Sequence, residues 1–114
     1  MRTVTLGVSS VHDTQKQLGA AFRGEHGGEF ISFATVELLW KVLTAKRWEI
    51  LQAITGQGEM TIREIARRIG RDVKAVHGDV QALLLAGVLD RAESGRVVFP
   101  YDAVRVDFTL RKAA

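Results

Sequence analysis

The chain has 114 residues, a net charge of +3 and no cysteine, and 46% of its residues are apolar. This length fits one compact domain with an accessory arm, and the apolar share supports a core without disulfides or structural metal. The lack of cysteine excludes thiolate zinc sites and cysteine nucleophiles. No run approaches the roughly 20 apolar residues that span a bilayer, and the start of the chain does not have the pattern of a signal peptide, so we expect a cytoplasmic protein with no membrane partner.

The first 34 residues predict a β-α-β arm. Residues 2–8 alternate apolar and polar side chains, which indicates a half-buried strand. Residues 13–23 have helical spacing, and the apolar residues at 30–33 indicate a second short strand. We expect this arm, residues 1–34, to serve dimerisation or partner binding.

The remaining residues, 35–114, begin with helices. One is predicted over residues 36–43, and Thr44 is the expected N-cap of a second helix that Gly56 ends. Trp40 and Trp48 fall on the apolar stripes of these helices, so we expect both to lie in the core or in a dimer contact.

Two more helices follow, separated by a tight turn. Thr61 and Glu64 fit a capping box, in which the hydroxyl accepts from the N–H of Glu64 and the carboxylate accepts from the N–H of Thr61. Gly70 ends that short helix, and Asp72 is the expected cap of the next one, over residues 72–86. The side chains expected on the buried side of the two helices are Ile62, Ile65, Ala66, Ile69, Val73, Val76, Val80, Leu83 and Leu84.

Strand patterns close the chain. Residues 88–100 predict a β-hairpin that starts at Val88 and turns at residues 93–95. Residues 103–110 alternate apolar and polar side chains most regularly of all. We expect this last strand to pair with the arm or with a second subunit.

Helix, short helix, tight turn, helix and hairpin in this order are typical of an α+β winged helix-turn-helix domain. In that fold the second helix of the motif, here 72–86, enters the DNA major groove, and the hairpin at 88–100 forms the wing. Basic side chains and helix N-termini in this region would bind phosphates. The DNA-binding residues predicted on this basis are Thr61, Arg63, Arg67, Arg71, Lys74, Ala75, His77, Gly78, Gln81 and Arg96. Asp79 would repel phosphate, so we expect it to pair with a nearby arginine or to accept from a cytosine amino group.

These segments also resemble a known family. Thr-Ala-Lys-Arg-Trp-Glu-Ile-Leu at 44–51, Thr-Ile-Arg-Glu-Ile-Ala-Arg-Arg-Ile-Gly-Arg at 61–71, Val-His-Gly-Asp-Val at 76–80 and Gly-Val-Leu at 87–89 are similar to MarR-like winged-helix regulators of archaea and bacteria. The resemblance implies a homodimer that binds double-stranded DNA at a promoter and represses it. Gly78 departs from the pattern, which usually has a larger residue there.

Two other kinds of function have less support from the residues. Some members of the similar subgroup are antitoxins, so the alternative is a protein that neutralises a small cognate toxin by protein–protein binding. An enzyme is not expected, because His12, His26 and His77 are far apart and no acid–base, cofactor or metal set can be assembled.

Overall fold

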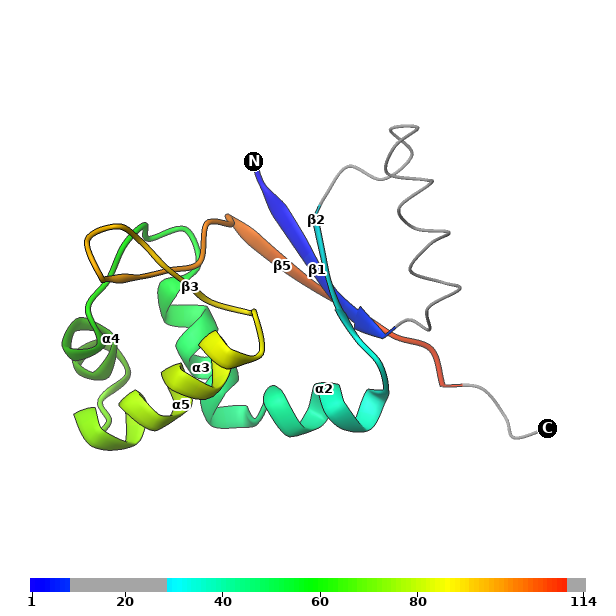
Figure 1. Cartoon of the computed structure of the whole chain (residues 1–114), viewed down its shortest axis with the longest axis horizontal. Helices are drawn as coiled ribbons and strands as arrows, with labels where there is room; N and C mark the ends of the chain where they lie inside the picture. Colours follow the sequence, from blue (N-terminus) through cyan, green and yellow to red (C-terminus); the bar gives the residue numbers. More distant parts are fainter. Residues whose placement is uncertain (9–28, 111–114) are drawn as a thin grey trace.

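The computed structural model describes residues 1–8 and 29–110. Within them the chain forms helices and two small sheets, which confirms the predicted mixed α+β class (Figure 1). The helix predicted over residues 13–23 lies outside the described residues. In chain order the elements are β1 (Thr3–Val8), β2 (Glu29–Phe33), α2 (Val36–Val42), α3 (Ala45–Ile54), α4 (Ile62–Ile69), α5 (Val73–Leu85), β3 (Asp90–Arg91), β4 (Val97–Val98) and β5 (Ala103–Asp107).

The larger sheet has the strand order β2-β1-β5, and all of its strands are parallel. The pairing of β1 with β5 confirms that the last strand joins the arm, across about a hundred residues of sequence. Strand β5 ends at Asp107, so the predicted extent to residue 110 is wrong. The reason is that Asp107 lies opposite Gly7 and β1 ends at Val8, so later residues have no partner strand to pair with.

Local hydrogen bonds begin and end the helices as the sequence predicted. A side-chain oxygen at each N-cap accepts from a backbone N–H in the first turn; Thr44, Thr61 and Asp72 are the predicted caps, and Thr35 is a further one that was not predicted. The second half of the predicted capping box is wrong. The Glu64 carboxylate accepts from the Thr61 hydroxyl at 3.2 Å, so it pairs with the side chain of the cap where a backbone N–H was expected.

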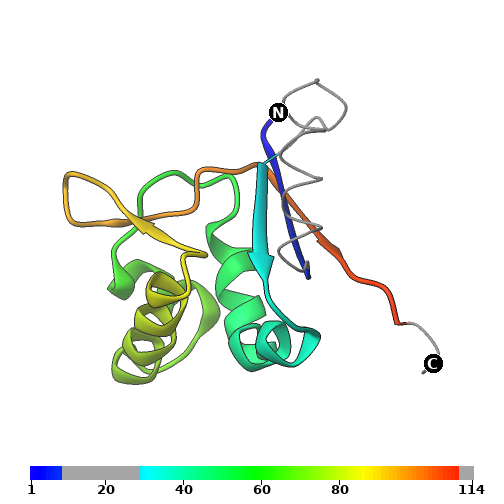
Figure 2. The same ribbon diagram turned by 45° about the vertical axis from the view of Figure 1, so that its right-hand side comes forward.

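One hydrophobic core joins the sheet to the helices. Val4 and Leu6 of β1 are fully buried, and Ile65, Val76 and Leu83 extend the same cluster through α4 and α5. Figure 2 shows the larger sheet beside α2 and α3, with α5 and the hairpin on the other side of α3. None of the helices in the described residues is long and apolar enough to cross a membrane.

The structure corrects one expectation about burial and decides part of another. Val73 is 43% exposed, because it lies in the first turn of α5, where it lines a surface groove described below. Trp40, expected either in the core or in a dimer contact, is 57% exposed, which rules out the core position alone; α2 is a short helix whose fully buried contact is Leu39.

The hairpin also begins later than predicted. Val88 and Leu89 are buried, but both donate their N–H groups to the carbonyl of Leu83 and therefore finish α5, so the first strand starts at Asp90. The returning strand is attached to the body of the protein, since Met60 and Val97 exchange two backbone hydrogen bonds of 2.8 Å. The hairpin is thereby held next to the start of α4.

Candidate nucleic-acid interface

The turn between α4 and α5 fixes how the two helices meet. Gly70 has a φ of 68°, a left-handed conformation that strongly favours glycine, and the N–H of Arg71 then returns to the carbonyl of Ala66 at 3.0 Å. Asp72 caps α5 directly afterwards. Three residues thus separate the end of α4 from the start of α5, and both helices bury apolar side chains in the common core.

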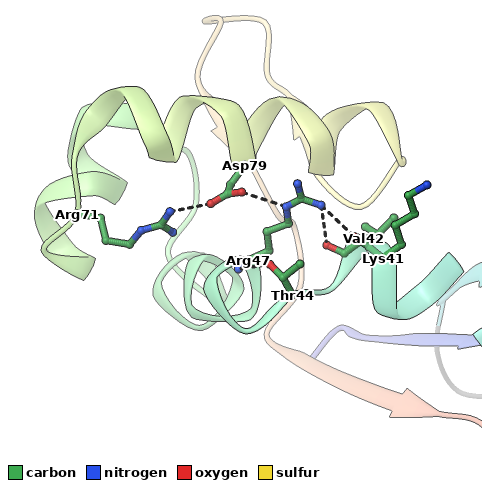
Figure 3. A network of polar contacts seen from close by, with 6 residues as sticks. All are labelled: Lys41, Val42, Thr44, Arg47, Arg71 and Asp79. Carbon is green, nitrogen blue, oxygen red and sulfur yellow. Dashed lines mark hydrogen bonds and ion pairs between the residues drawn. The ribbon is translucent and has the colours of Figure 1, made fainter. Parts of the chain in front are cut away.

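A polar network holds α5 against the rest of the fold (Figure 3). Asp79 accepts from Arg47 Nε at 3.1 Å and from an Arg71 terminal nitrogen at 2.8 Å. Arg47 also donates to the carbonyl oxygens of Lys41 and Val42, both at 3.2 Å. The Asp79 carboxylate therefore connects α5 to the first turn of α3 and to the turn before α5, and Arg47 extends the network to the end of α2.

The charge of Asp79 is satisfied inside the protein. Partial burial by itself would raise the pKa of this carboxyl, but the hydrogen bonds and positive charges of Arg71 and Arg47 outweigh burial, and the net pKa is lowered. The expected pairing of Asp79 with an arginine is confirmed. One of its two arginine partners is Arg71, a residue predicted to contact DNA, whose side chain is only 17% exposed and whose Nη1 is buried. Arg71 is directed into the fold.

A surface groove of about 510 Å³ lies between the start of α4, the start of α5 and the hairpin. Its basic side chains are Arg63, Arg91, Arg96 and His77, and none of the described residues that line it is acidic. The full lining is Met60, Thr61, Ile62, Arg63, Val73, His77, Arg91, Ser94, Gly95, Arg96 and Val97. A groove with this charge suits a polyanion such as a nucleic-acid backbone.

The hairpin side of the groove is held in place by hydrogen bonds. Arg91 donates to the carbonyl of Gly95 at 3.0 Å, and the Ser94 hydroxyl donates to the Glu59 carboxylate at 2.5 Å. Arg91 was missed by the sequence reasoning, which placed only Arg96 at the hairpin. The available signal was its position at the end of the first strand, just before the turn, where its side chain can return to the groove.

The other predicted residues fall into three places. Thr61, Arg63, His77 and Arg96 meet at the groove. Lys74, Ala75 and Gly78 are exposed on α5, Gln81 is half-buried one turn further along, and Arg67 is exposed near the end of α4. At Gly78 an added Cβ would meet no atom within 4 Å, so this part of α5 is open to an approaching surface.

Among the described residues, no group of three His, Cys, Asp or Glu side chains could hold a metal ion. The chain belongs to the HVO_A0114 family, whose model matches residues 42–106, from the end of α2 to Val106 in β5. The match includes the whole groove and the polar network except Lys41. No curated protein and no solved structure matches the chain.

Proposed function

We propose that this protein is a winged helix-turn-helix transcriptional regulator similar to the MarR-like group, which binds double-stranded DNA as a homodimer and represses a promoter. In this proposal α5 enters the major groove and the hairpin β3–β4 is the wing. The observation that carries it is the basic groove between α5 and the hairpin. A DNA backbone seated there would lie beside the exposed face of α5.

The size and chemistry of that face agree with the proposal. A major groove about 12 Å wide admits one helix, and small side chains allow a closer approach. Ala75 and Gly78 are the small residues, and Lys74 and Gln81 flank them with groups that can bond to phosphates or base edges. Asp79 does not oppose binding, because its charge is paired with Arg47 and Arg71.

The groove arginines and the α5 face have different expected roles. Arg63, Arg91 and Arg96 surround a space beside α5 and are suited to phosphates, which would give salt-dependent and sequence-independent affinity. Lys74 and Gln81 are suited to preference for one sequence over another. The two roles can be separated by measurement.

The test is fluorescence anisotropy with the DNA upstream of the protein's own gene and with a scrambled duplex, each at two salt concentrations. We expect tighter binding to the upstream DNA than to the scrambled duplex. Gln81→Ala should reduce this preference, whereas Arg96→Ala should weaken binding to both duplexes about equally and lower its salt dependence. Lys41→Ala is the matched control for loss of a positive charge, since Lys41 is exposed on α2, outside the groove. Equal, weak binding to both duplexes that none of these substitutions changes would refute the proposal.

A further inference from the structure

An apolar surface lies on α2 and β5, apart from the basic groove. Trp40 is 57% exposed and Val106 is 38% exposed, and both line a groove of about 500 Å³. Phe108, 36% exposed, packs edge-on against Trp40 with ring centroids 5.5 Å apart. The remaining lining residues are Leu39, Leu43, Thr44, Ala45 and Trp48. Contiguous apolar surface with two exposed aromatic rings is typical of an interaction site.

Strand β5 borders this surface and is an edge of the sheet. Among the described residues it pairs with β1 alone. The N–H of Ala103 donates to the carbonyl of Arg2, and successive residues of a strand turn their N–H and C=O groups to opposite sides. Val104 and Val106 therefore direct their backbone groups away from β1, toward the free edge. An edge with apolar side chains and unpaired backbone groups favours another strand.

We propose that a second copy of this chain pairs its β5 antiparallel with this β5, across a two-fold axis at Val106, and covers the apolar groove. The two β-sheets then continue into one. The inference deepens the proposed function and rests on its homodimer, while DNA binding remains a separate measurement. The partner is a second copy because the charges along β5 are self-complementary.

The register of the pairing follows from those charges. With the axis at Val106, Arg105 of each copy lies opposite Asp107 of the other, and Val104 lies opposite Phe108. An axis at Arg105 would set two arginines against each other, and an axis at Asp107 would set two carboxylates against each other. Like charges directly opposite in a sheet are destabilising, and opposite charges are stabilising, so the register at Val106 is favoured.

Backbone geometry supports the same register. Because the residues with free backbone groups are 104 and 106, Val106 would exchange both of its hydrogen bonds with its own copy at the axis. Arg105 and Asp107 then occupy the closer, non-hydrogen-bonded positions. Within one chain Arg105 Nη2 lies 3.7 Å from Asp107 Oδ2, a long ion pair. The two side chains are 70% and 55% exposed, so they can turn to the partner copy.

The same axis brings the apolar surfaces together. Val106 lines the groove with Trp40, so both are on the helix side of the sheet. A two-fold axis perpendicular to the sheet keeps the two copies' helix sides on one face. The rings of Trp40 and Phe108 from each copy then meet over the paired strands and lose their exposure to water.

The experiment is sedimentation velocity over a dilution series from tens of micromolar to nanomolar, without DNA. We expect the wild-type chain, 12.6 kDa, to sediment at twice that mass in the micromolar range. Arg105→Asp and Asp107→Arg each set like charges against each other at two symmetric places, so each should raise the dissociation constant at least about tenfold. The double variant, Arg105→Asp with Asp107→Arg, restores opposite charges in every pair and should restore the dimer.

Circular dichroism establishes that each variant is folded, and Lys41→Ala is the control for an exposed charge outside β5. A wild-type chain that stays monomeric at tens of micromolar overturns the inference. So does a dimer that both single reversals leave unchanged, or a double variant no more dimeric than the single ones. If the upstream DNA is bound but the free chain is monomeric, the β5 interface is refuted while the proposed DNA binding stands. A β5 dimer that binds no DNA supports the interface and refutes the proposed DNA binding.

Discussion

The replacement of Asp79 by asparagine tests how α5 is held in place. The carboxylate accepts one hydrogen bond from Arg47 and one from Arg71, and its side chain is 19% exposed. Asparagine keeps the shape and one acceptor oxygen but removes the charge. Its NH2 group would then face one of the two guanidinium groups, donor against donor.

The loss of stability can be worked from these contacts. A hydrogen bond to a charged group contributes about 1.5–3 kcal/mol, and a buried donor without an acceptor costs about 1–3 kcal/mol. Both arginines keep some contact with solvent, at 22% and 17% exposed, which reduces the penalty. We therefore expect Asp79→Asn to lower the free energy of unfolding by about 2 kcal/mol, equivalent to a fall in Tm of roughly 10 °C for a domain of this size.

The effect should also depend on pH in one direction. The folded-state pKa of Asp79 is lowered, so the carboxylate stabilises the protein above its unfolded pKa of about 4. That stability is lost as the pH falls through the folded pKa. The difference in free energy of unfolding between wild type and Asp79→Asn should thus be largest at neutral pH and shrink below about pH 4.

Urea denaturation followed by far-ultraviolet circular dichroism measures this difference in free energy of unfolding at each pH. Glu49→Gln is the matched control, because it removes an exposed carboxylate from α3 and should change the free energy of unfolding by less than about 0.5 kcal/mol. The stabilising role of the Asp79 charge would be refuted if Asp79→Asn changed the free energy of unfolding as little as the control does. It would also be refuted if the difference from wild type were as large in acid as at neutral pH.

The remaining predictions concern backbone conformation and a titration. Gly78→Ala should raise the free energy of unfolding by about 0.5–1 kcal/mol, because α5 gains a better helix former and the new Cβ meets nothing; an unchanged or lower urea midpoint would contradict this. Gly70→Ala should lower the free energy of unfolding by about 1–2 kcal/mol in the same assay, since φ is 68° there. An unchanged free energy of unfolding would contradict this and show that the turn can relax. Tyr101 is the chain's only tyrosine, and burial, together with a hydrogen bond to the Glu29 carboxylate, raises its pKa to about 12. Phenolate absorbance should appear near pH 12 while the protein is folded, and Glu29→Gln should move its midpoint toward pH 10. Because the folded pKa is raised, the stability that this group contributes is lost as the pH climbs from about 10 through 12. A wild-type midpoint near pH 10 would be inconsistent with the burial of Tyr101.

Much of the local structure follows from the sequence by itself. Thr44, Thr61 and Asp72 begin helices, and Gly70 ends one, because caps and left-handed turns depend on hydrogen bonds between residues a few positions apart. The alternation in residues 2–8 predicts a strand for a similar reason, since successive side chains face opposite sides. These patterns determined the α+β class and the order of the helices and the hairpin.

The candidate site was predictable only in part. Arg63, His77 and Arg96 are surface residues at helix and turn positions, so sequence spacing placed them in the right region. Arg71 has the same local signature, yet it is held by Asp79 inside the fold. Spacing along the chain cannot separate an arginine that faces solvent from one that faces a carboxylate eight residues later.

Only the tertiary structure decided the contacts between distant segments. The parallel pairing of β1 with β5 joins residues about a hundred positions apart, and the sequence left open whether β5 would pair within the chain or with a second subunit. Within the described residues the same pairing leaves one edge of β5 without a neighbouring strand and Trp40 exposed beside it, although its helical stripe indicated either a core position or a dimer contact. The physical reason is that burial depends on which surfaces meet once loops have closed, whereas periodicity reports only which side chains share a face.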